Sequence, residues 1–219
     1  MSEQYEQDGT LDAAAAVRWL TAAAAAVDRE ADRLTELDSA IGDADHGSNL
    51  RRGFQAVADA LESDPKDSPG AVLQLAGRQL VSTVGGASGP LYGTLLRRTG
   101  KTLGEAERVT AQALTAALRS GVDAVAKLGS SAQGDKTMLD ALYPAVEAME
   151  AASGAEAEVY AAGARAAEEG ARFTVPMRAR KGRASYLGER SEGHQDPGAT
   201  SSALLMNALA EAVGGGPGE

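Results

Sequence analysis

A long stripe of apolar residues near the amino terminus constrains the fold more than any other feature of the chain. Its members recur mostly three or four positions apart, at Val17, Leu20, Ala24, Val27, Ala31, Leu34 and then Ile41. This spacing places them on one face of an α-helix. We therefore expect one long helix that begins near Leu11 and ends close to Asp38.

Similar periodic segments, separated by loops rich in glycine and proline, follow along the rest of the chain. Their approximate ranges are 46–61, 71–84, a short helix opening at 94, 105–125, 135–152, 155–171 and 199–213. No alternating apolar run is long enough to indicate a strand. The sequence thus predicts a single all-α domain over residues 1–219, with antiparallel helices and with loose tails at about 1–9 and 214–219.

Composition excludes several classes of function. The net charge of −10 argues against nucleic acid as a partner, because binding a phosphate backbone requires clustered lysine and arginine. The absence of cysteine excludes disulfides and thiolate metal sites. No apolar run approaches the ~20 residues of a membrane span, and the acidic residues 1–8 do not resemble a secretion signal. We expect a cytoplasmic protein with neither a nucleic-acid nor a membrane partner.

Three aspartates, Asp38, Asp43 and Asp45, fall within eight positions at the end of the first expected helix. Carboxylate oxygens are the ligands that Mg²⁺ prefers, with waters and substrate phosphates completing its shell. The backbone N–H groups that open the next helix suit a phosphate. This junction is therefore a candidate metal–nucleotide site. The alternative is that Asp45 is only a helix N-cap, with the other two carboxylates solvated beside it.

Two further segments have functional and structural interpretations that the sequence leaves open. The glycine-rich stretch 85–93 could hold phosphates through backbone N–H groups and the Ser88 hydroxyl, or it could be only a turn between helices. The basic stretch 180–183 could offset the charge of a nucleotide in an acidic protein, or it could be a solvated loop. His46 is the better functional candidate of the two histidines because it adjoins the aspartates; His194 does not.

Residues 129–137 nearly spell the phosphate-binding P-loop pattern, but two features argue against it. Asp135 interrupts the pattern, and the segment before it is helical, whereas a P-loop follows a strand. We therefore reject a P-loop fold. Asp135 is expected instead to cap the helix over 135–152.

Five ordered motifs together resemble one family, the nucleotide-binding L subunit of dihydroxyacetone kinase. They are Asp-x-x-x-Gly-Asp-x-Asp-His-Gly-x-Asn over 38–49, Gly-Gly-Ala-Ser-Gly-Pro-Leu-Tyr-Gly over 85–93, Gly-Asp-Lys-Thr-Met-Leu-Asp-Ala-Leu over 134–142, Lys-Gly-Arg-Ala-Ser-Tyr-Leu-Gly-Glu-Arg over 181–190, and Gly-His-Gln-Asp-Pro-Gly-Ala over 193–199. The match runs from about Leu11 to Val213. Five motifs in one order are far more specific than any single one.

The resemblance implies an eight-helix antiparallel barrel that holds a nucleotide, ADP or ATP, in the loops at one end. It implies two Mg²⁺ ions on Asp38, Asp43 and Asp45, bridging these carboxylates to the phosphates. The nucleotide-binding residues that it implies are His46, Gly47, Ser48 and Asn49 beneath the phosphates, Ala87 and Ser88 at the phosphate end, Gly129 and Met138 beside the base, and Arg183, Asp196, Pro197 and Gly198 closing the site.

The implied activity is that of a phosphotransferase subunit that works only with partners. A phosphocarrier M subunit would phosphorylate the bound ADP, and the group would pass to dihydroxyacetone held by a K subunit. No catalytic nucleophile is required on this chain, because phosphoryl transfer depends mainly on positioning and charge neutralisation. Two alternatives remain: an L subunit that consumes free ATP, with a separate K chain or in a related acyl-substrate kinase, and a regulatory module that binds a transcription factor.

Overall fold

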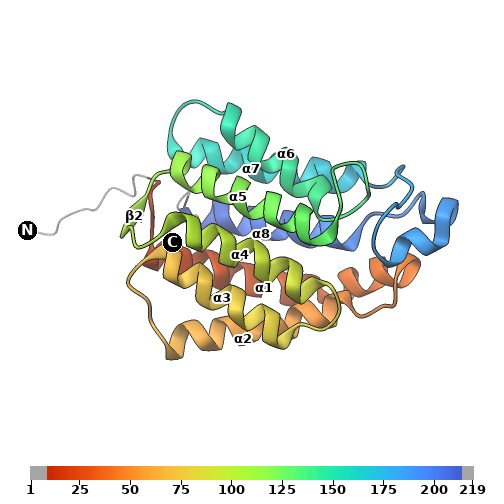
Figure 1. The fold of residues 1–219 in the computed structure, drawn as a ribbon, viewed down its shortest axis with the longest axis horizontal. Helices are drawn as coiled ribbons and strands as arrows, with labels where there is room; N and C mark the ends of the chain where they lie inside the picture. The colour runs from red at the N-terminus through yellow and green to blue at the C-terminus, as the bar shows by residue number, and fades with distance from the viewer. Residues whose placement is uncertain (1–8, 214–219) are drawn as a thin grey trace, which may run out of the picture.

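The computed structural model describes residues 9–213, and these residues form an all-helical domain, as predicted. Figure 1 shows its helices running side by side. The α-helices of this part are α1 Ala13–Ile41, α2 His46–Ser63, α3 Pro69–Thr83, α4 Ser88–Leu103, α5 Ala111–Gly129, α6 Leu139–Ala151, α7 Glu156–Phe173 and α8 Pro197–Val213, and a 3-10 helix, η1, spans Arg183–Ser191.

The helices alternate in direction along the chain. Each contacts the next, and α8 returns to contact α1, so the contacts close into a ring. The junctions α1–α2, α3–α4, α5–α6 and α7–α8 consequently gather at one end of the domain, at the right in Figure 1. The other three junctions and both ends of the described chain lie at the opposite end. All four even-numbered helices therefore begin at the same end.

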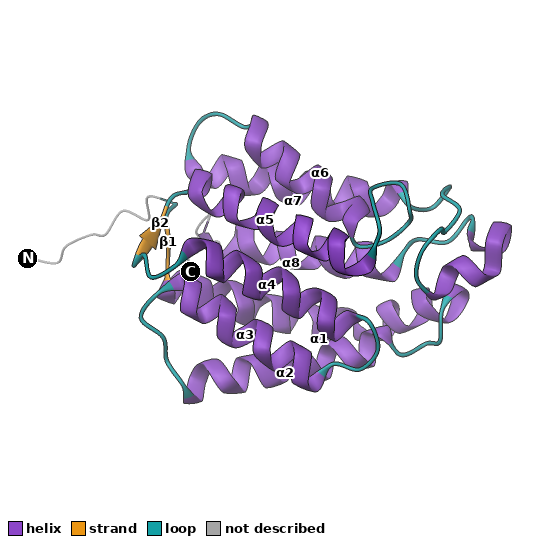
Figure 2. Cartoon of the chain, viewed as in Figure 1, coloured by secondary structure: helices purple, strands orange, loops and turns teal. Residues whose placement is uncertain are grey.

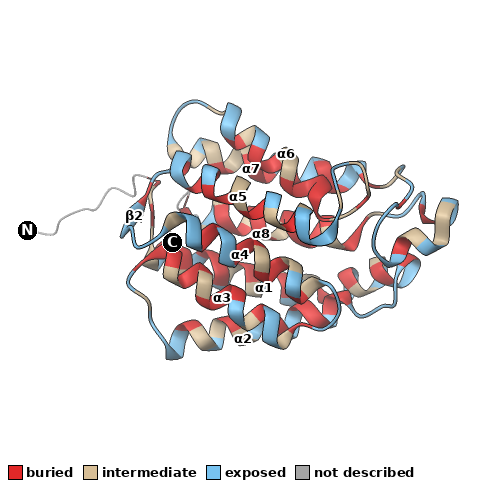
Figure 3. Cartoon of the chain, viewed as in Figure 1, coloured by how far each residue is buried: buried red, intermediate tan, exposed pale blue. Residues whose placement is uncertain are grey.

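The core lies inside this ring, where the helices turn their buried faces toward one another (Figure 3). The expected stripe on α1 is buried at Leu20, Val27, Ala31 and Leu34, among others. Trp19, fully buried on the same helix, donates a hydrogen bond from Nε1 to the carbonyl of Leu205 on α8, at 2.8 Å. Of the described helices, none is both long and apolar enough to span a membrane.

Helices α3 and α4 approach each other through glycines. A Cβ added to Gly77 would lie 2.8 Å from the carbonyl oxygen of Gly93, and a Cβ added to Gly93 would lie 2.8 Å from that of Gly77. About two turns away along the two helices, Gly70 on α3 and Gly100 on α4 face each other in the same way. Backbone thus packs directly on backbone, an approach that only glycine permits.

The expectation of no strand is wrong in one small respect. Strands β1, Leu11–Asp12, and β2, Arg108–Val109, pair antiparallel at the end that holds both ends of the described chain (Figure 2). Two residues per strand are too few to produce the alternation that identifies a strand in a sequence.

Three helix starts also differ from those expected. Helix α4 begins at Ser88 rather than near Thr94, because Gly89 and Pro90 are accommodated in its first turn. Helix α5 begins at Ala111 rather than near Glu105, since Thr110 caps it. Helix α6 begins at Leu139, not at Asp135.

One described residue, Gly9, was expected in the loose amino-terminal tail and does not behave as such. Gly9 is buried against Glu156 at the start of α7. The rest of the two expected tails, 1–8 and 214–219, lies outside the described residues.

Candidate functional site

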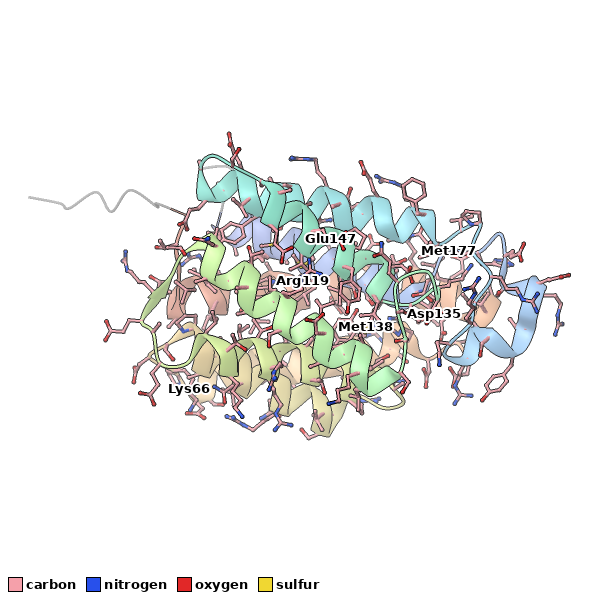
Figure 4. All side chains as sticks on the ribbon, turned by 45° about the horizontal axis from the view of Figure 1, so that its top comes forward. Lys66, Arg119, Asp135, Met138, Glu147 and Met177 are labelled. Atoms are coloured by element: carbon pink, nitrogen blue, oxygen red, sulfur yellow. The ribbon has the colours of Figure 1, made fainter. Side chains whose placement is uncertain are left out.

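A pocket of about 200 Å³ opens at the end where the even-numbered helices begin. Figure 4 shows Asp135, Met138 and Met177 near this end and Lys66 at the other. Four segments far apart in the sequence line the pocket: the α1–α2 junction, the start of α4, the loop before α6, and the segment 174–196 with the start of α8. We call residues 174–196 the cover segment.

The three predicted metal ligands converge on one side of the pocket. Asp38, Asp43 and Asp45 each offer a carboxylate oxygen, and these atoms all lie within 4.8 Å of one another. Asp38 is buried, and its Oδ2 accepts hydrogen bonds from the backbone N–H groups of Asp45 at 2.9 Å and His46 at 3.2 Å. The residue that caps α2 is thus Asp38, while the Asp45 side chain makes no cap bond. The interpretation of Asp45 as a simple N-cap is therefore wrong.

The backbone of this junction is held in an unusual geometry. Ala44, between two of the aspartates, has a φ of 61°, a left-handed conformation that costs energy for a residue with a Cβ. A Cβ on Gly47 would collide with the carbonyl oxygen of Ala31 and lie 2.5 Å from Thr35 Oγ1. Glycine is thus needed for α2 to start directly against α1. Close packing fixes the position of the aspartates.

His46 links three helices beneath the pocket. Its Nε2 lies 2.9 Å from Ser201 Oγ, and its Nδ1 lies 3.2 Å from Ser88 Oγ. Ser201 Oγ can donate its own proton to the Pro197 carbonyl at 3.0 Å; with that bond formed, a neutral His46 carries its proton on Nε2 and accepts from Ser88 at Nδ1. Burial lowers the pKa of His46, against the opposing effects of Asp38 and Asp45, and favours this neutral form.

The start of α4 presents backbone donors to the pocket. Residues 85–88 line it, and Ala87, the N-cap, makes no side-chain cap bond. The start of α6 differs, because Leu139 N donates to Thr137 Oγ1 at 3.2 Å and Asp140 N donates to the Thr137 carbonyl at 3.0 Å. The first N–H groups of a helix have no intrahelical partner, and together with the helix dipole they suit an anion. The glycine-rich stretch is therefore partly a loop and partly the opening of a helix that points into the pocket.

A side chain caps α8, as Asp38 caps α2. Asp196 is buried, and its Oδ2 accepts from the N–H of Ala199 at 2.7 Å. The pKa of Asp196 is raised to about 7, mainly by burial and also by the nearby Asp140, against the opposing effects of Lys136 and of the N–H groups of Ala199 and Gly198.

An ion pair crosses the mouth of the pocket. Arg183 Nε in the cover segment lies 3.0 Å from Asp43 Oδ2 in the aspartate loop. Lys181 and Gly182 line the pocket beside Arg183. Most of the basic stretch thus faces the pocket. Arg180 is exposed, and its backbone N–H donates to the Asp135 carbonyl at 3.0 Å.

Most of the residues predicted for the site line this pocket. They are Asp38, Asp43, Asp45, His46, Ala87, Ser88, Met138, Arg183, Asp196, Pro197 and Gly198.

The remaining four predicted residues do not line the pocket. Gly47 faces α1, and Ser48 Oγ donates to the Asp45 carbonyl at 2.9 Å. Asn49 is buried and accepts from Arg52 at 2.7 Å. Gly129 lies at the end of α5, with Ser131 nearby. Contacts of these four with a ligand stay a prediction.

Sequence reasoning missed Lys136 and misassigned Asp135. Asp140, in the first turn of α6, accepts from Thr137 N at 2.7 Å and from Gly134 N, while Asp135 Oδ2 accepts from Ala132 N at 2.8 Å. The expected capping of α6 by Asp135 is therefore wrong. Lys136 is 1% exposed and lines the pocket from beneath. Its signals in the sequence were its place in the rejected P-loop pattern and in the motif over 134–142, and neither indicated a role for it.

Comparisons with known proteins agree on one family. Residues 40–211 match the family described as the DAK2 domain. The chain is 44% identical over 200 residues to the PEP-dependent dihydroxyacetone kinase ADP-binding subunit DhaL of Escherichia coli, covering 90% of this chain and 95% of that protein. It is 37% identical over 218 residues to D-erythrulose kinase of Mycolicibacterium smegmatis, covering 97% of this chain and 38% of that one.

A solved structure is similar as well. The dihydroxyacetone kinase of C. freundii, in complex with AMP-PNP and Mg²⁺, superposes with a TM-score of 0.68 at 28% identity. The match covers 90% of this chain and 33% of the C. freundii chain.

Proposed function

Because this chain belongs to the family of DAK2 domains, we propose that it is the nucleotide-binding subunit of a dihydroxyacetone kinase, a phosphotransferase that acts together with partner subunits. It holds ADP or ATP with Mg²⁺ and relays a phosphoryl group from a phosphocarrier M subunit to dihydroxyacetone on a K subunit. The single observation that carries the proposal is the triad of carboxylates beside the uncapped start of α4. A cytoplasmic location is part of the same proposal.

The donor set fits Mg²⁺. Asp38 uses Oδ2 to cap α2, which leaves Oδ1 as a candidate ligand atom. Asp45 makes no cap bond, and the Asp43 carboxylate is paired only with the exposed Arg183, within the described residues. Three carboxylates could hold two Mg²⁺ ions, which would neutralise phosphate charge when bound. Arg183 would then exchange Asp43 for a phosphate oxygen, a bidentate acceptor that suits a guanidinium.

The chain's own residues position the nucleotide. The N–H groups at the start of α4 donate to phosphate oxygens, and the apolar Met138 side chain borders the base. Asp196, Pro197 and Gly198 close the site. No residue needs to form a covalent bond, since phosphoryl transfer depends on alignment and charge neutralisation.

An ATP-consuming subunit is the second candidate, favoured by the similarity to the C. freundii dihydroxyacetone kinase solved in complex with AMP-PNP and Mg²⁺. The two candidates differ in how long the nucleotide stays. A relay subunit must keep ADP through every cycle, whereas an ATP-consuming one must release it. Affinity differences between related sites lie mostly in the off-rate.

The test is to purify the chain in Mg²⁺ without added nucleotide, to denature it, and to measure how much nucleotide is released per chain. We expect close to one ADP per chain, no exchange with labelled ADP, and conversion to ATP by a phosphocarrier. The isolated chain should not phosphorylate dihydroxyacetone with ATP, and a K subunit plus a phosphorylated donor should restore transfer. Rapid exchange, or turnover by the chain alone, would contradict the relay.

A further inference from the structure

Lys136 is a buried cation whose donors are all used by backbone. Its Nζ donates to the carbonyl oxygens of Met177 at 3.0 Å, Ser191 at 2.7 Å and His194 at 2.6 Å. An ammonium has three protons, so this arrangement leaves none for a phosphate. The φ of Lys136 is 62°, a strained left-handed conformation for a lysine. Such strain persists only where surrounding structure fixes it.

All three carbonyls belong to the cover segment, on both sides of the part that reaches the pocket. Met177 precedes residues 181–184, which line the pocket, and Ser191 follows them. His194 lies just before the lining residues 196–198. One side chain on the loop before α6 therefore fixes the base of the cover at three points.

The cover has little apolar packing of its own. Its buried apolar residues, Ala179 and Ala184, form a small cluster with Ile41 at the end of α1, separate from the main core, and Leu187 packs against it. Other polar bonds run mostly within the cover, such as Ala179 N to Ser191 Oγ at 2.9 Å and Gly193 N to the Val175 carbonyl at 2.8 Å. Segments with few buried apolar contacts open at low free-energy cost. The bonds of Lys136 therefore make up much of what holds the cover to the helices.

We propose that Lys136 is a positioning residue that holds the cover segment over the pocket and thereby sets the rate at which bound nucleotide leaves. This rests on the proposed function, because it assigns a role within that site. Because the three protons of Lys136 Nζ go to these carbonyls, none is left for a ligand. It acts through Arg183 and the residues 196–198, whose positions depend on the backbone that it binds.

The test compares Lys136→Met, Lys136→Arg and, as a matched control, Lys127→Met on the exposed end of α5. Release of a fluorescent ADP analogue is followed in Mg²⁺ by stopped flow with excess unlabelled ADP. We expect release to accelerate about tenfold or more in Lys136→Met, with association unchanged or faster and Lys127→Met behaving as wild type. Lys136→Arg should resemble Lys136→Met, because a planar guanidinium does not match three carbonyls arranged for an ammonium.

Amide hydrogen exchange without nucleotide separates positioning from a general loss of stability. In Lys136→Met we expect loss of protection at Ala179, Arg180 and Gly193, while the amides of α1 and α8 keep theirs. Uniform loss across the helices would mean that Lys136 only stabilises the fold. That result overturns the proposal. Wild-type release by Lys136→Arg, beside fast release by Lys136→Met, would support it, because a second cation would then hold the same carbonyls.

This design distinguishes two failures. If the wild-type chain retains no nucleotide, the proposed function fails, and the exchange measurement still tests whether Lys136 holds the cover. If the wild type retains nucleotide and Lys136→Met releases it at the same rate, the proposed function stands and the role of Lys136 does not.

Discussion

The two ends of the domain begin their helices differently. At the end away from the pocket, Asp12 caps α1, Ser68 caps α3 and Thr110 caps α5, each accepting from a backbone N–H at 2.8 to 3.2 Å. At the pocket end, α4 begins at Ala87 with no side-chain cap bond. Side-chain caps stabilise helices, and uncapped helix starts bind anions. The N–H groups at a helix start therefore serve stability where a side chain caps them, and they are left for recognition at α4.

The division is not complete at either end. Helix α7, which begins away from the pocket at Ala155, has no side-chain cap, but Glu156 and Glu158 in its first turn place negative charge where the helix dipole favours it. At the pocket, α2 is capped by Asp38, and α8 is capped by Asp196. The cap of α8 requires a carboxylate to be buried, and the cost appears as its raised pKa. The comparison therefore predicts different consequences for substitutions at the two ends.

The largest effect should come from Asp43→Ala, at the pocket end. Loss of one of the three carboxylates should abolish the stabilisation by Mg-ADP, about 2.7 kcal/mol at a hundredfold excess over the wild-type Kd. Stability without ligand should change little, because the ion pair of Asp43 with Arg183 is exposed to solvent and such pairs contribute little. Thermal melting with and without Mg-ADP measures both quantities.

Asp28→Ala, on the exposed face of α1, is the matched control and should keep the full ligand-induced shift. If Asp43→Ala kept it as well, the assignment of Asp43 as a metal ligand would be wrong.

A smaller effect should appear in the pH dependence of stability without ligand. Burial raises the pKa of Asp196 from 3.8 to about 7, so the unfolded chain loses this proton first and the fold is destabilised as pH rises between these values. His46 acts in the opposite direction, because its lowered pKa makes the fold more stable as pH rises toward 6.5. Asp196→Asn removes the pH dependence that comes from Asp196 and keeps the one that comes from His46. The asparagine side chain can still cap α8.

We therefore expect the free energy of unfolding of Asp196→Asn, relative to that of the wild type, to increase by on the order of 2 kcal/mol as pH rises from about 5 to about 7. Urea unfolding in EDTA at both pH values measures the difference. Equal changes in the two proteins would show that the cap at the pocket end has no such cost.

The smallest effect should come from Thr110→Ala, at the other end. Loss of the cap of α5 should cost about 1 kcal/mol of folding stability, with no change in nucleotide release. Thr102→Ala, an exposed substitution late in α4, is the control and should be neutral or slightly stabilising. A change in nucleotide release in Thr110→Ala would break the separation between the two ends.

The aspartate loop could be predicted from the sequence because its ligands are local. Asp38, Asp43 and Asp45 are brought together by one helix end and one short loop, so spacing alone indicates their proximity. The helices could be predicted as well, because the periodicity of apolar residues is also a local feature of the sequence. Helix starts were less certain, because Ser88 can open a helix or belong to a loop until the neighbouring helices are present.

The cover segment could not be predicted in this way. Lys136 binds carbonyls 41, 55 and 58 residues further along the chain, and a backbone carbonyl has no identity in a sequence. A buried lysine also contradicts the usual expectation that this side chain is exposed. The part of the site that depends on contacts between distant residues and backbone therefore became visible only in the structure.

The glycine contacts between α3 and α4 bear on how changes accumulate in relatives of this chain. Neither Gly77 nor Gly93 lines the pocket, yet each faces backbone that leaves no room for a methyl group. Natural selection should therefore remove substitutions there as strictly as at the aspartates. An invariant glycine in this helix pair would record a steric limit, and a search for functional residues based on invariance alone would mistake it for part of the site.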